Sequence, residues 1–139
     1  MKCALIFLAF VLLSTITFAQ NFLGMSQQGV ISEIKKYYGE KIKISYEEET
    51  LFWNPNDGLG SQFLKFKGGV CNESTFIPKD IGTLRAFETM FNDRYTKQSK
   101  NVWIYSNDII IYRITLKYLI HEKNPTERIP FSFIYTYNN

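Results

Sequence analysis

The residue types best suited to covalent chemistry in this chain are Cys71 and His121, a thiol and an imidazole. Such a pair acts as nucleophile and base only when the imidazole lies within hydrogen-bond distance and the thiol pKa is lowered. Neither residue sits in a recognisable hydrolase signature, and the G-x-S-x-G motif of serine hydrolases is absent from the sequence. We therefore favour a buried strand cysteine and a loop histidine, with a thiol hydrolase as the alternative.

Carboxylates form the second group of candidates, and four of them fall at predicted loops or strand ends: Asp57, Glu73, Asp80 and Asp108. A facing pair of carboxylates can hydrolyse a glycoside. The same residue types are also favoured in turns and at helix N-caps, and this is the interpretation that we prefer. The three consecutive glutamates at 47–49 cannot all point to one side of a strand, so they predict a solvated turn or edge.

No metal site and no cofactor is predicted. The chain has one histidine, and only one cysteine after residue 19, which leaves too few ligands for a zinc site of imidazoles and thiolates. The segment at 54–61 has the wrong ligand spacing for a calcium loop, so it predicts an ordinary loop. Glycine motifs that bind nucleotide phosphates are absent from the sequence.

The first 19 residues have the three parts of a secretory signal peptide. Lys2 supplies positive charge, residues 4–13 form an apolar core, and Thr17 and Ala19 precede a predicted cut at Gln20. The apolar run is well short of the roughly 20 residues that a membrane-spanning helix needs, so no stable membrane span is expected. We expect the mature protein to be exported, either periplasmic or secreted.

Residues 20–139 are predicted to form a single domain, long enough to bury a hydrophobic core. Only Cys71 remains in this segment, so no internal disulfide can form. The whole chain has a net charge of +3 and its basic residues are scattered, which argues against nucleic acid as a partner. Aromatic residues make up 17% of the chain, and they favour strands and large contact surfaces.

The first predicted element after the signal is a helix that begins at its N-cap, Ser26, and ends at Gly39. An alternating strand follows over 41–46, and a short apolar run covers 51–53. A second helix begins at the N-cap Asp80. Its buried stripe is predicted to contain Leu84, Phe87, Phe91 and Tyr95.

Between these helices, Gly68-Gly69 predicts a tight hairpin turn. A two-residue turn pairs Phe66 with Cys71, but it also puts Glu73 on the apolar face. Either a bulge near Asn72 or a longer turn would remove this conflict, and the sequence leaves both open.

After the second helix, residues 96–100 are predicted to be a polar exit, and strands are predicted over 102–105 and 109–121. A polar loop covers 121–128 in this prediction. The last strand is expected over 129–137, and one of its faces carries five apolar or aromatic residues: Ile129, Phe131, Phe133, Tyr135 and Tyr137.

These elements predict an α+β fold. We expect an antiparallel sheet of about five to six strands with two helices packed on one face, in the order helix, strands, helix, strands. The order has the form of two helix-then-strands units in tandem, although no repeat is visible at the level of individual residues.

The stretch from Phe22 to Gly39, through Gly24-Met25-Ser26 and Val30, resembles the opening of the small exported bacterial domains typified by BamE and by β-lactamase inhibitor protein. In such domains a short helix and a glycine lead into an antiparallel sheet, so the resemblance implies the same start here. The lipid-bearing cysteine of the BamE family is missing, and the likeness implies no specific function.

The sequence predicts an exported, non-catalytic module that binds another protein or a small ligand through its sheet. Its candidate contact residues are Trp53, Trp103, Tyr135 and Tyr137, for which packing in the core is the alternative. A small secreted hydrolase that uses loop carboxylates or Cys71 is the alternative function.

Overall fold

The computed structural model describes residues 22–55, 58–106 and 110–137, so the predicted signal peptide, Asp57 and Asp108 lie outside the described residues. The elements of the described chain are, in order, α2 (Gln27–Tyr38), β1 (Ile44–Glu47), β2 (Thr50–Trp53), β3 (Gly60–Lys67), β4 (Val70–Pro78), α3 (Ile81–Arg94), β5 (Thr96–Ser99), β6 (Val102–Ser106), β7 (Ile111–His121) and β8 (Asn124–Tyr137).

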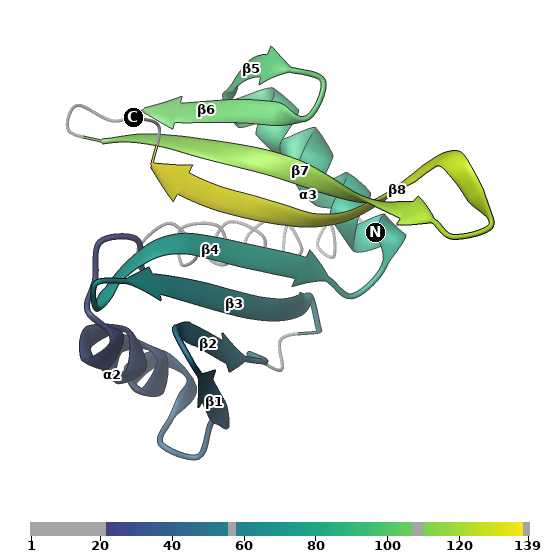
Figure 1. The fold of residues 1–139 in the computed structure, drawn as a ribbon. Coiled ribbons are helices and arrows are strands. Elements are labelled where there is room, and N and C mark those ends of the chain that lie inside the picture. The colour runs from purple at the N-terminus through teal and green to yellow at the C-terminus, as the bar shows by residue number, and fades with distance from the viewer. Residues whose placement is uncertain (1–21, 56–57, 107–109, 138–139) are drawn as a thin grey trace, which may run out of the picture.

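The strands form one open antiparallel sheet in the order β1-β2-β3-β4-β8-β7-β6-β5 (Figure 1). Each half of the sheet is built from strands that follow one another along the chain. The halves meet where β4 pairs with β8, over four residue pairs that run from Glu73 and Thr136 to Phe76 and Phe133. β8 is therefore a central strand, with β4 on one side and β7 on the other.

The fold class predicted from the sequence is wrong. We expected about five to six strands with two helices in the order helix, strands, helix, strands, whereas the described chain forms eight strands in one open sheet with two helices. Strand residues outnumber helix residues by a wide margin.

The strands that pattern reasoning missed are polar or lie in predicted loops. All four residues of β5 are exposed, so no apolar alternation marks it. Its Lys97 places the ammonium group 5.5 Å from the ring centroid of Trp103 on β6, and its backbone pairs with that strand. β8 begins at Asn124, inside the predicted polar loop, because it pairs with β7 for most of that strand's length.

The β3–β4 hairpin keeps Glu73 off the apolar face by means of a bulge after a two-residue turn. Gly68 and Gly69 both have positive φ, at 60° and 78°, as a two-residue turn of type I′ requires. Phe66 pairs with Cys71 as predicted, and the register then shifts by one residue so that Lys65 pairs with Glu73. The bulge thus falls at Asn72, and it moves the Glu73 side chain off the apolar face.

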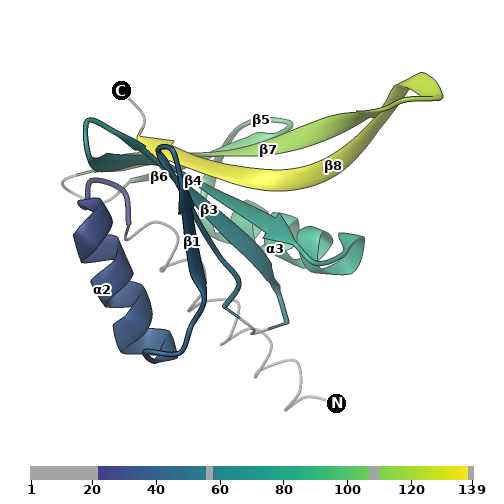
Figure 2. The same ribbon diagram turned by 60° about the horizontal axis from the view of Figure 1, so that its bottom comes forward.

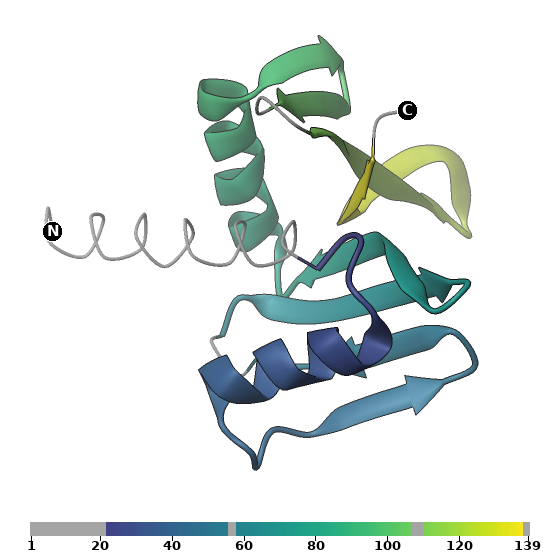
Figure 3. The ribbon, with the colours of Figure 1, turned by 90° about the vertical axis from the view of Figure 1, so that its left-hand side faces the viewer.

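One face of the sheet carries the hydrophobic core. A row of inward side chains crosses six strands: Leu51, Leu64, Ser74, Tyr135, Ile114 and Trp103. Both helices bury apolar residues in the same cluster as this row. Figure 3 shows α2 beside the β1–β4 half and α3 beside the β5–β8 half.

The helix signals of the sequence are confirmed. The Ser26 side chain accepts a hydrogen bond from the amide of Gly29, at 3.2 Å, and Asp80 accepts one from the amide of Thr83, at 2.7 Å. Three residues of the predicted α3 stripe are buried, namely Leu84, Phe87 and Phe91, while Tyr95 is the half-buried C-cap. The ring of Phe91 lies 5.0 Å from that of Phe133, which joins α3 to the central strand.

The predicted apolar face of the last strand is only partly correct. Phe133 and Tyr135 are buried, but Phe131 is 38% exposed. The pairing of β7 with β8 shifts between Lys117 and Tyr118, which leaves Phe131 as the extra residue of a bulge. The side chains before this bulge therefore point to the opposite faces from those that strict alternation along the strand predicts.

Candidate functional site

Three of the four predicted contact residues lie in the core. Trp53, Trp103 and Tyr135 are at most 1% exposed, and burial raises the pKa of the Tyr135 hydroxyl well above its usual value. Tyr137 is half-buried, and its ring stacks on that of Tyr112 at 5.8 Å. No partner can reach the first three side chains while the protein stays folded, so a contact surface has to be sought among other residues.

Cys71 and His121 lie at opposite ends of the molecule. Cys71 is at the β3–β4 turn, beside the end of β8 that carries Tyr137, whereas His121 pairs with Asn124 at the other end of that strand. Thirteen residues of extended strand span roughly 40 Å. Burial raises the pKa of the Cys71 thiol to about 12, so the geometry brings together no thiol and imidazole.

The candidate carboxylates that the structure describes have structural partners. Glu73 lies 2.9 Å from the ammonium group of Lys65, and Asp80 caps α3. Glu47 ends β1, Glu48 and Glu49 form the turn to β2, and all three side chains are exposed. Among residues 22–55, 58–106 and 110–137, no three histidine, cysteine or acidic side chains are grouped closely enough to hold a metal ion.

The most unusual surface of the described chain is a two-stranded projection, which we call the arm and define as residues 117–132. The last residue of β7 that pairs with β6 is Thr115, and the first residue of β8 that pairs with β4 is Phe133. Beyond these positions the two strands pair only with each other in the described chain. Figures 1 and 2 show this hairpin extending well beyond the rest of the sheet.

Large apolar side chains are exposed on the arm. Four of them are between 38% and 68% exposed: Leu119, Ile120, Ile129 and Phe131. Leu119 faces Ile129 across the two strands, while Ile120 and its cross-strand neighbour Arg128 occupy the opposite face. Both faces of the arm therefore present apolar groups to solvent.

The two free edges of the arm differ in their backbone chemistry. The β8 edge contains Pro125 and Pro130, which have no amide proton to donate and so hinder pairing with another strand. The β7 edge, residues 117–121, has no proline. The strands at the two ends of the sheet, β1 and β5, are only four residues long and largely exposed. An added strand thus meets the fewest obstacles at the β7 edge of the arm.

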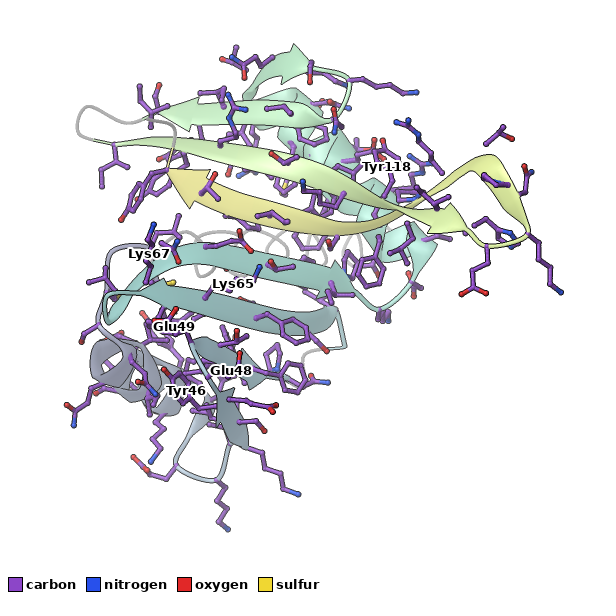
Figure 4. The ribbon with its side chains drawn as sticks, viewed as in Figure 1. Tyr46, Glu48, Glu49, Lys65, Lys67 and Tyr118 are labelled. Carbon is purple, nitrogen blue, oxygen red and sulfur yellow. The ribbon has the colours of Figure 1, made fainter. Side chains whose placement is uncertain are left out.

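A basic hollow of about 460 Å³ lies between the base of the arm and α3. Its lining consists of Arg85, Glu88, Lys97, Lys100, Asn101, Tyr118, Arg128 and Pro130. The helix, the β5–β6 hairpin and both strands of the arm each contribute residues to it. Figure 4 shows Tyr118 at the point where the arm leaves the sheet.

The face of the sheet opposite the helices carries a mixture of apolar and polar side chains. One row there contains Phe52, Phe63, Thr75, Ile134, Thr115 and Val102, all of them half-buried. The rings of Phe52 and Phe63 lie 4.7 Å apart. The neighbouring row contains the Lys65–Glu73 ion pair. Figure 4 labels Lys65 on this face. This face therefore carries fewer strongly exposed apolar groups than the arm does.

Sequence reasoning missed both the arm and the basic hollow. One signal of the arm was available, because Leu119 and Ile120 are adjacent apolar residues that interrupt the alternation of a half-buried strand. The hollow left no such signal, since its cations are spread between Arg85 and Arg128. They meet only in the folded chain, where α3, the β5–β6 hairpin and the arm line the same hollow.

Comparisons with protein-family models, with curated proteins and with solved structures find no significant match to this chain. Within the described residues, no helix has both the length and the apolar character that crossing a membrane requires.

Proposed function

We propose that this protein is an exported, non-catalytic module that binds a partner protein through the arm. The observation that supports the proposal is the exposure of four large apolar side chains on a hairpin that no third strand of the described residues supports. A two-stranded hairpin alone is marginally stable in water, and exposed apolar strands with free edges associate readily. A partner that covers the arm would stabilise the hairpin and would keep its apolar side chains and free edge from associating with other molecules.

The partner that fits best supplies an extended segment that adds to the β7 edge, in line with β6. Backbone hydrogen bonds with residues 117–121 would supply affinity, because no proline removes an amide proton from this edge. Successive residues of the segment would point to opposite faces of the arm, so apolar residues among them would pack beside Ile120 on one face and beside Leu119 on the other. This chemistry selects a segment with apolar residues on both of its faces rather than a charged one.

A pair of matched double variants tests this surface. Leu119→Gln/Ile120→Gln removes the apolar groups of the β7 edge, and both side chains are exposed enough for the fold to tolerate the change. The control, Ile81→Gln/Ile111→Gln, changes two side chains that are 54% and 44% exposed and lie off the arm. Equal melting temperatures for the two variants would establish that each is folded.

Capture should be carried out from the exported fraction of the source cells with all three proteins as bait. We expect one protein retained by the wild type and the control and lost with the arm variant. Its purified form should bind the wild type at least about tenfold more tightly than the arm variant, since buried apolar contacts at an interface commonly contribute more than 1 kcal/mol each. A partner held equally by all three proteins would refute the role of the arm.

Two further outcomes would also overturn the proposal. A wild-type homodimer in light scattering that becomes monomeric in the arm variant would make a second copy of the chain the occupant. Turnover of a substrate in a panel of hydrolase substrates, abolished by Cys71→Ser, would replace the binding module with the thiol hydrolase.

The export part of the proposal rests on the charge, apolar core and small residues of positions 1–19. The intact mass of protein from the exported fraction tests it. We expect the mass of a chain that begins at or near Gln20, and a mass that still includes residues 1–19 would contradict the cleavage.

A further inference from the structure

The basic hollow concentrates positive charge. Four cationic side chains line it, from Arg85, Lys97, Lys100 and Arg128, against the single carboxylate of Glu88. This excess is as large as the net charge of the whole chain, which is +3. The charged side chains of the rest of the full chain therefore sum to zero, and the hollow is a local concentration of positive charge.

The Glu88 carboxylate already forms an ion pair with one of these cations. Its carboxylate is in ion contact with the guanidinium group of Arg85, one helical turn away on α3. None of the ion pairs between described residues involves Lys100 or Arg128. Like charges that converge from separate segments repel one another, so an anion between them would stabilise the arrangement.

The frame that carries the cations is held in place by hydrogen bonds. The Asn101 side-chain amide donates to the carbonyl oxygen of Leu116 at 3.1 Å, and the backbone amide of Leu116 donates to the carbonyl oxygen of Asn101 at 2.9 Å. These two bonds fix the β5–β6 turn, and with it Lys100, against β7. Lys97 lies over the ring of Trp103, at 5.5 Å, and so points along the helix-covered side of the sheet.

The remaining wall of the hollow is not charged. Tyr118 and Pro130 face each other across the two strands of the arm and contribute an aromatic ring and a pyrrolidine ring. Flat apolar faces of this kind accept the ring or carbon chain of an organic group. The volume of about 460 Å³ is within the range of small-ligand pockets.

We infer that the basic hollow binds a small phosphate ester, with the phosphate between Lys100, Arg128 and Lys97 and the organic group against Tyr118 and Pro130. Arg and Lys are the side chains that recognise phosphate oxygens, Arg through paired N–H groups and Lys as a point charge. This inference goes beyond the proposed protein-binding function, and it uses a different set of residues from the β7-edge contacts of Leu119 and Ile120.

Calorimetric titration with glucose 1-phosphate at low salt tests the site. We expect saturable binding of one ligand per chain that weakens as sodium chloride is added, because salt screens exposed charges. Lys100→Gln/Arg128→Gln should weaken binding by about tenfold, since two exposed charge contacts are removed. Tyr118→Leu should weaken glucose 1-phosphate binding more than binding of inorganic phosphate, which has no organic group to pack.

The matched control is Lys41→Gln/Lys43→Gln, which removes two exposed lysines that do not line the basic hollow. This variant should bind as the wild type does. Equal weakening in the control would overturn the inference, because it would show a general response to net charge. Absence of saturable binding of both glucose 1-phosphate and inorganic phosphate to the folded wild type would overturn it as well.

The phosphate ester could belong to a soluble compound or to a lipid headgroup, and vesicles separate these sources. Phosphatidylcholine vesicles with and without phosphatidic acid serve as the probe. Binding that requires phosphatidic acid and is lost in Lys100→Gln/Arg128→Gln supports the site with a lipid as its source. Binding of glucose 1-phosphate without vesicle binding supports it with a soluble ligand.

Discussion

Native alkylation of Cys71 at pH 8 should be at least about a thousandfold slower than alkylation of the unfolded chain. The thiolate is the reactive form, and burial raises the pKa of this thiol from 9.0 to about 12. Each pKa unit lowers the thiolate fraction about tenfold, so the shift alone gives a factor of about a thousand. The side chain is also fully buried, which blocks the reagent directly.

The second route to reaction, through transient opening, is suppressed to a similar degree. Cys71 makes two backbone hydrogen bonds of 2.8 Å to the segment before α2, one with Gly24 and one with Met25. Exposing the thiol requires both bonds to break and the core around it to open. If this takes most of a typical free energy of unfolding, about 5 kcal/mol or more, reaction by this route is slowed by at least a few thousandfold.

The assay is a time course with iodoacetamide, read by intact mass, on the chain from Gln20 onward. The same protein in concentrated guanidinium chloride gives the unfolded rate. The matched control is Cys71→Ala/Asn72→Cys, which moves the thiol to the adjacent exposed position at the bulge, and it should react at nearly the unfolded rate. A native rate for wild-type Cys71 within tenfold of the unfolded rate would refute the reasoning.

Three further predictions concern the fold. Gly60→Ala should lower the free energy of unfolding by more than about 2 kcal/mol, because the added Cβ would lie 2.1 Å from the backbone carbonyl oxygen of Ile77. The melting temperature should fall with it, and an unchanged melting temperature would contradict this placement. Deletion of residues 129–139 should abolish the cooperative unfolding transition in urea, since it removes the part of β8 that joins the two halves of the sheet. The amide of Thr83 lowers the pKa of Asp80, so the carboxylate stabilises the folded state above pH 3.8, and this contribution disappears as pH falls through the lowered pKa. Asp80→Asn should therefore show a weaker loss of stability between pH 5 and pH 2 than the wild type, and identical acid profiles would remove Asp80 from this role.

Local signals in the sequence predicted those parts of the fold that local chemistry decides. The caps at Ser26 and Asp80 and the Gly68-Gly69 turn depend on residues within a few positions of each other, and the structure confirms all three. The bulge at Asn72 was one of two options, and the choice depended on pairing with a strand that only the fold supplies.

The strand count was missed for a physical reason that β5 illustrates. An edge strand needs a partner on one side only, so its residues can all be polar, as Thr96–Ser99 are. Long-range pairing also explains why two aromatic residues were wrongly predicted as contact residues. Trp53 and Trp103 are large enough to serve as contacts, but registers of β2 and β6 turn them inward, and register follows from long-range pairing.

The junction between β4 and β8 has a consequence for how the chain reaches this structure. Hairpin partners such as Lys67 and Val70 are near neighbours in sequence, whereas Phe76 and Phe133 are separated by roughly sixty residues. Closing so long a loop costs more entropy, and we expect the junction to form late. Ile134→Val at the junction should therefore speed unfolding and leave the refolding rate unchanged; slower refolding would show early formation.

Until the junction closes, each half exposes one full strand edge that matches the other half. At high concentration, β8 of one chain can then pair with β4 of another through the same residue pairs, giving an exchanged dimer with native contacts. We therefore expect the concentration at which the protein is refolded to set the balance between the monomer and such an intertwined dimer.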